Sequence, residues 1–82
     1  MSRTSKLVEV LARSLVDQPE LVRIKEVPRR DGTYIEVSTG DGDLGKVIGR
    51  QGRTAKAVRN LAAIAAEMDG VRASVGFADE GN

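Results

Sequence analysis

Residues 45–54 read Gly-Lys-Val-Ile-Gly-Arg-Gln-Gly-Arg-Thr, and this stretch decides the fold. An apolar pair, Val47 and Ile48, precedes two glycines three positions apart, Gly49 and Gly52. Glycine lets a backbone turn tightly and carries no side-chain bulk, so a ligand can approach the main chain closely. The stretch therefore predicts a break between two helices, with bare backbone at the break.

Helices are predicted on both sides of this break. Asp43 can cap a short helix that runs to about Ile48. A longer, alanine-rich helix is predicted over 54–68, ended by the Asp-Gly pair at 69–70. We expect its buried stripe to consist of Val58, Leu61, Ala62 and Ala65.

The chain before the break predicts a helix and a hairpin. Ser2 or Thr4 can cap a helix to about Asp17, whose expected apolar stripe is Leu7, Val8, Leu11 and Leu15. A strand is predicted over 21–27, closed by Pro28. A turn with an Asp-Gly pair follows, and then a returning strand over 33–39.

Apolar residues alternate again over 71–77, which predicts a third strand. The predicted order is α-β-β-α-α-β. The strands at 33–39 and 71–77 should be parallel, because a long helical crossover returns the chain alongside its starting strand. We expect one α+β domain over 1–82: a three-stranded mixed sheet with helices on one face, ordered over about 4–78, with a loose tail at 79–82.

Composition narrows the range of functions. The 82 residues include neither cysteine nor histidine, which argues against zinc sites and most nucleophile–base pairs, so we expect no cofactor, no metal and no enzyme activity. No signal peptide and no apolar run of membrane-spanning length is visible, which predicts a cytoplasmic protein without membrane insertion.

Positive charge is concentrated around the break. Residues 44–66 hold five cations and no acid, whereas the remaining chain has eight cations and twelve acids. Such a stripe suggests a polyanion site, although a solvated helix face explains it as well. The start of the second helix adds unpaired N–H groups and a positive dipole end, which favour a phosphate there. The expected contacts with such a polyanion are Lys46, Ile48, Gly49, Arg50, Gln51, Gly52, Arg53, Thr54 and Lys56.

Val47-Ile48-Gly49-Arg50-Gln51-Gly52 resembles the signature of KH domains, an apolar pair followed by a G-x-x-G loop with a basic middle residue. The element order resembles the type II arrangement, and the chain looks most like the short bacterial KH proteins of the KhpA family. The resemblance implies a module that clamps about four nucleotides of single-stranded RNA. It also places the hairpin beside the groove, which makes Arg29 and Arg30 further expected RNA contacts, although solvation of the turn explains these two arginines as well. Ala55 departs from the bulky aliphatic residue that often follows the loop.

The same resemblance implies an RNA chaperone or post-transcriptional regulator with links to cell-wall synthesis and cell shape. It implies pairing with a second copy or with another, larger KH-domain protein. Four alanines, at positions 62, 63, 65 and 66, leave the long helix with little bulk, although alanine is also simply the best helix former. A protein-interaction module with secondary RNA binding is the alternative function.

Other readings of the sequence are weaker. Residues 40–45 match the dinucleotide pattern G-x-G-x-x-G, but the following helix is short and two aspartates would repel a pyrophosphate. One tyrosine and one phenylalanine are too few for readers of RNA that depend on aromatic stacking, and both are expected to pack.

Overall fold

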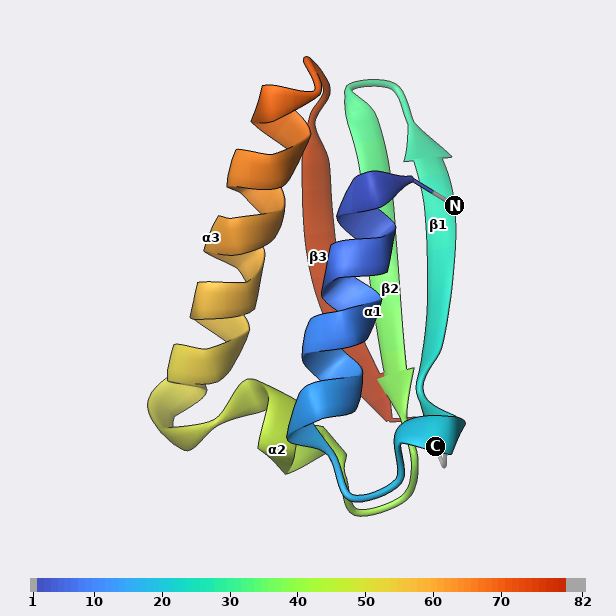
Figure 1. Cartoon of the computed structure of the whole chain (residues 1–82), viewed down its shortest axis with the longest axis vertical. Helices are drawn as coiled ribbons and strands as arrows, with labels where there is room; N and C mark the ends of the chain where they lie inside the picture. The colour runs from blue at the N-terminus through green and yellow to red at the C-terminus, as the bar shows by residue number, and fades with distance from the viewer. Residues whose placement is uncertain (1, 80–82) are drawn as a thin grey trace.

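The computed structural model describes residues 2–79, which form a three-stranded sheet with helices on one face (Figure 1). Along the chain come α1 (Arg3–Leu15), a 3-10 turn (Pro19–Leu21), β1 (Arg23–Arg29), β2 (Gly32–Thr39), α2 (Leu44–Ile48), a second 3-10 turn (Arg50–Gly52), α3 (Arg53–Met68) and β3 (Ala73–Asp79). This order confirms the predicted α+β class. Within the described residues, no helix is both long and apolar enough to cross a bilayer.

The sheet has the strand order β1-β2-β3. β1 and β2 are antiparallel, and β3 lies parallel to β2 on its other side, as predicted. Helices α2 and α3 fill the connection between the two parallel strands and bring the Gly49–Gly52 loop to one end of the molecule. The β1–β2 hairpin lies at the opposite end (Figure 1).

The core lies between the sheet and the helices. Ile35 and Val37 of β2 are completely buried at its centre, where α1, α2 and α3 converge. Burying a side chain of this size stabilises the fold by about 1.5–3 kcal/mol. The core cluster consists of Val8, Ala12, Val22, Ile35, Val37, Val47, Val58, Ala62 and Val75.

Helix α1 is shorter than predicted. The Ser2 hydroxyl accepts a hydrogen bond from the Ser5 N–H at 3.0 Å and caps the helix, but the helix ends at Leu15. Beyond it, the main-chain N–H of Gln18 donates to the Asp43 carboxylate at 3.0 Å, which draws the chain away from the helix axis. The predicted stripe was wrong at Leu15, which is 39% exposed.

The N-terminus is tied to the sheet. The main-chain N–H of Ser2 donates to Glu26 on β1 at 2.9 Å. This hydrogen bond, helped by the hydroxyl of Ser5, lowers the pKa of the Glu26 carboxyl. The first turn of α1 is therefore held against β1 by a bond that is stronger when Glu26 is ionised.

Pro28 does not close β1, contrary to the prediction. The strand starts later and ends later, at Arg23 and Arg29, and Pro28 is paired opposite Thr33. β1 is an edge strand, where a proline is tolerated because its missing N–H can face outward. Leu21 lies in the preceding 3-10 turn and not in the strand.

The buried face of α3 was only half predicted. Ala55, Val58, Ala62 and Ala66 are buried, whereas Leu61 is 46% exposed and Ala65 is half-buried. Alanines mark both faces of the helix, so hydropathy alone misplaces the stripe by one residue.

Strand β3 is shifted relative to the prediction. Gly70 has a φ of +74°, Val71 is exposed, and the strand runs from Ala73 to Asp79. Part of the predicted loose tail is therefore strand, and residues 80–82 lie outside the described part of the chain.

Candidate nucleic-acid interface

The Gly49–Gly52 loop has the bare, tightly turned backbone that its sequence predicts. Gly49 has a φ of +76° and Gly52 a φ of +72°, both in the region that favours glycine. A Cβ on Gly49 would lie 2.7 Å from the Cβ of Thr54, so a side chain at this position is excluded by packing as well as by conformation. Thr54 therefore supports the loop from behind, and it is half-buried there.

The two middle residues of the loop point into solvent. Arg50 and Gln51 are exposed, and Gln51 adopts a left-handed conformation with a φ of +56°. That conformation costs a residue with a Cβ about 1–2 kcal/mol. The amide oxygen of Gln51 accepts a hydrogen bond from Arg53 at 3.0 Å, which holds a second cation beside the loop.

The N-terminus of α3 opens directly onto this loop. Gly52 is the N-cap residue and supplies no side-chain capping bond. The Arg53 N–H donates to the main-chain oxygen of Arg50, and the N–H groups that follow it have no side-chain cap. Such groups bind phosphate readily, because they point outward and carry the positive end of the helix dipole. Among the described residues, no carboxylate lies within 4.0 Å of Arg50, Arg53 or Lys56.

Lys46 is less available than predicted. Its ammonium lies 3.4 Å from Asp17 and 3.7 Å from Asp43, on the side of α2 that faces the end of α1. Asp43 is only 2% exposed and does not cap α2 with its side chain. The structure therefore pairs Lys46 with two acids, and Ile48 packs partly buried against the core.

Arg29 and Arg30 are not brought to the loop. They lie at the β1–β2 hairpin, at the other end of the sheet from α2 and the loop (Figure 1). Nine of the predicted contact residues thus gather around the loop, and these two form a separate group.

Sequence reasoning missed the groove between α3 and β3. Arg59 of α3 donates from its Nε to the main-chain oxygen of Val75 at 3.0 Å, and its guanidinium lies 5.3 Å from the centre of the Phe77 ring. Farther along, a cavity of about 490 Å³ opens between the two elements, lined by Ala63, Glu67, Gly70, Val71, Arg72 and Ala73. The spacing of Arg59, Ala63 and Glu67, one helical turn apart, was the signal for a common face toward β3.

Known proteins resemble this chain in sequence and in architecture. The family model described as KhpA/KhpB, KH domain matches residues 5–76. A protein named RNA-binding protein KhpA from Clostridium perfringens is 48% identical over 61 residues, covering 74% of this chain and 81% of its own. One of the same name from Chlamydia trachomatis is 40% identical over 70 residues, covering 85% and 90%.

A protein of that name from Mycobacterium bovis is 52% identical over 56 residues, covering 68% of this chain and 70% of its own. A crystal structure of Era from Aquifex aeolicus superposes on 93% of this chain with a TM-score of 0.63 and 16% identity, and the match spans 29% of the Era chain. At that identity the likeness concerns the fold alone. The KH family is one of RNA-binding modules and not of enzymes, which confirms the predicted lack of catalysis. From the family match and the relatives, the chain belongs to the KhpA/KhpB family of KH-domain proteins.

Proposed function

We propose that this chain binds single-stranded RNA and clamps its phosphodiester backbone at the Gly49–Gly52 loop. The observation that carries the proposal is the loop itself: bare backbone, a helix N-terminus without a side-chain cap, and three cations that have no carboxylate partner within residues 2–79. The left-handed Gln51 supports it, because backbone strain of this kind persists mainly at ligand sites. The curated relatives named RNA-binding proteins agree with this function.

Charge reversal in the loop tests the clamp. Arg50→Asp combined with Gln51→Asp should abolish most RNA affinity and leave the circular dichroism spectrum and the cooperativity of melting unchanged, because both side chains are exposed. Lys6→Asp combined with Ser14→Asp, at exposed positions of α1, lowers the net charge by the same three units and should bind as the wild type does. Undiminished RNA binding by a well-folded loop variant would contradict the assignment of the loop as the RNA clamp.

We propose that the chain also pairs with a second copy or with another KH-domain protein. The support is a stripe of large apolar side chains on the outer face of α3: Leu61 is 46% exposed, Ile64 57% and Met68 79%. With Ala57 they recur at helical spacing and face away from the core. This stripe also favours the alternative function, a protein-interaction module, in which RNA binding is secondary.

Sedimentation equilibrium at micromolar concentration tests the pairing. The wild type should have the mass of a dimer, and Ile64→Asp should have that of a monomer, because it places a charge in the apolar stripe. Ala63→Asp adds the same charge at an exposed position of α3 on the side that faces β3, away from the stripe, and should stay dimeric. A monomer mass for the wild type at every concentration would contradict the proposed homodimer.

A dimer would carry two loops, and two weak contacts on one particle raise avidity without new contacts. This geometry supports an RNA chaperone in the cytoplasm, which should accelerate annealing of complementary strands in a fluorescence assay. The loop variant should lose that acceleration. Post-transcriptional regulation and the links to cell-wall synthesis and cell shape stay predictions, to be tested by complementing a deletion strain with the wild type or the loop variant.

A further inference from the structure

The face of the sheet opposite the helices carries a second group of basic residues. Because Ile35 and Val37 point into the core, their neighbours on β2 and the residues paired with those neighbours point the other way. This open face is made by Arg23, Lys25, Val27 and Arg29 of β1, Tyr34, Glu36 and Ser38 of β2, and Ser74, Gly76 and Ala78 of β3. Within residues 2–79, no helix packs against it.

Tyr34 leans across this face. A Cβ on Gly76 would lie 2.7 Å from Cζ of the Tyr34 ring, so the ring reaches from β2 over β3, and only a glycine at that position leaves it room. The guanidinium of Arg29 lies 4.7 Å from the centre of the ring. An aromatic ring and a planar cation are therefore stacked on an open sheet.

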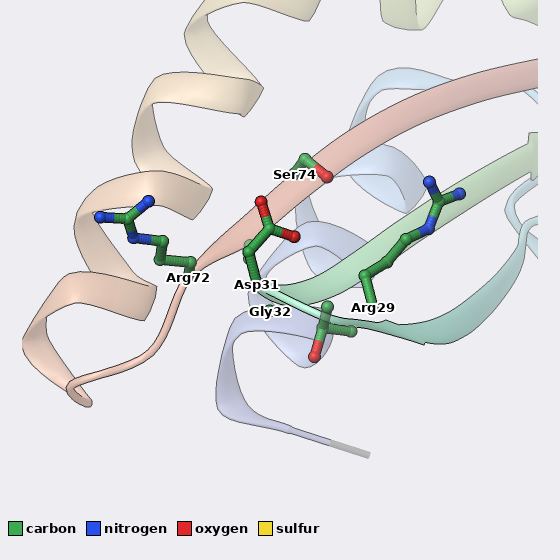
Figure 2. Close-up of a pocket in the computed structure, with 7 residues that line it drawn as sticks. Arg29, Asp31, Gly32, Arg72 and Ser74 are labelled. Atoms are coloured by element: carbon green, nitrogen blue, oxygen red, sulfur yellow. The ribbon is translucent and has the colours of Figure 1, made fainter.

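A cavity of about 320 Å³ adjoins this pair, at the start of β3 (Figure 2). Arg29 and Arg72 flank it, Ser74 contributes a hydroxyl, and Asp31 lies between the two arginines. Neither arginine has a carboxylate within 4.0 Å among the described residues, whereas Arg3, Arg13 and Lys46 on the helical side are all ion-paired. Arg29 and Arg72 are thus available to an anionic ligand, whereas Arg23, on the same face, already donates to the main-chain oxygens of Glu20 and Val22.

Arg72 connects this cavity to the groove described above. It lines both the cavity between α3 and β3 and the cavity on the open face, and Ala73 does the same. A strand that follows α3 from the Gly49–Gly52 loop reaches Arg72 at the far end and can turn around it onto the sheet.

We infer that the open face is a second contact site for single-stranded RNA, in which a base stacks on the Tyr34–Arg29 pair and phosphates bind Arg29 and Arg72. Bases stack on tyrosine rings and on arginine guanidinium planes, and the stacking tolerates any sequence. Asp31 repels phosphate, which leaves the position beside it to a base edge. The inference rests on RNA binding as proposed above. It extends the bound RNA segment beyond the roughly four nucleotides that a KH loop clamps, and it assigns Arg29 to a contact site separate from the loop.

Tyr34 itself reports on this site. The chain has one tyrosine and no tryptophan, so its intrinsic fluorescence comes from this face alone. Titration with dodecauridylate should quench the tyrosine emission, with N-acetyltyrosinamide titrated in parallel to correct for absorption by the RNA. Arg29→Ala combined with Arg72→Ala should weaken dodecauridylate binding about tenfold, within the range found for a single stacked base, and should leave tetrauridylate binding unchanged. Lys6→Glu, at an exposed position of α1, lowers the net charge by the same two units and should behave as the wild type.

The loop clamp and the open-face site can be refuted independently of each other. Tetrauridylate binding that survives the loop double variant would refute the clamp and leave the open face standing. Dodecauridylate that binds, by anisotropy, without quenching Tyr34 would overturn the second site, and so would oligoglutamate that quenches as strongly as RNA, because the face would then select acidic peptides. If the double arginine variant does not fold, ultraviolet crosslinking of the wild type decides: a crosslink at Tyr34 supports the site, and crosslinks confined to the loop and α3 overturn it.

Discussion

The salt dependence of RNA binding should reveal how many loop cations contact phosphates. Arg50, Arg53 and Lys56 lack carboxylate partners among the described residues, whereas Lys46 is paired with Asp17 and Asp43. Each phosphate contact on a single strand contributes about −0.7 to the slope of log K against log salt, so three contacts give about −2.1. Between about 50 and about 200 mM salt, the affinity should therefore fall roughly 18-fold.

Removing one contact should change this slope by a defined amount. Arg50→Ala should reduce its magnitude by about 0.7, so that the same change of salt costs only about sevenfold in affinity. Lys46→Ala removes the same charge but should leave the slope close to that of the wild type, because its ammonium is already held by two acids. Anisotropy of a labelled tetrauridylate at several salt concentrations measures both. Equal slopes for the two variants would refute the reasoning, since they would show a diffuse electrostatic surface.

Three further outcomes are expected. Gly49→Ala should lower the free energy of unfolding by at least about 1–2 kcal/mol in denaturant titrations, because alanine pays for a positive φ, and a wild-type midpoint would contradict this. Glu26→Gln should destabilise the protein near neutral pH and have no effect in acid. Because folding lowers the pKa of Glu26, its contribution to stability is present above the pKa of the unfolded chain and is lost as the pH falls through the pKa of the folded protein. A difference in melting temperature that does not depend on pH would argue against this role of Glu26. Among alanine variants of α3, the loss of RNA affinity should decrease in the order Arg53 > Lys56 > Arg59. Arg59 comes last because its side chain already donates to a main-chain oxygen. Equal losses at the three positions would argue against a localised clamp.

The fold could be predicted because its signals are local. The two glycines of the loop, the Asp-Gly turn and the alternation in the strands each depend on a few neighbouring residues. The phase of α3 could not be read in the same way, since Ala62 and Ala65 differ little in hydropathy from their neighbours and only packing against the sheet separates them.

The site was predictable in its backbone and less so in its side chains. The loop follows from glycine spacing, but the pairing of Lys46 with Asp17 joins residues far apart in the sequence. The separation of Arg29 and Arg30 from the loop could have been read from the order of elements, because the two arginines precede the strand at 33–39 and the loop follows it. The hydrogen bond from Arg59 to Val75, in contrast, requires α3 and β3 to be in place.

The two edges of the sheet have a consequence for the behaviour of the protein at high concentration. Two of the three strands, β1 and β3, are edge strands. Edge strands are where sheets of separate molecules can join and aggregate. Thr33 of β2 directs its N–H to Arg72, away from β1, so Pro28, its partner on β1, faces the outer edge at a point where it has no N–H to offer. On β3, the outward oxygen of Val75 is already taken by Arg59. Each edge is thus interrupted, near the end of β1 and in the middle of β3, and such interruptions hinder the joining of sheets from separate molecules when the protein is concentrated.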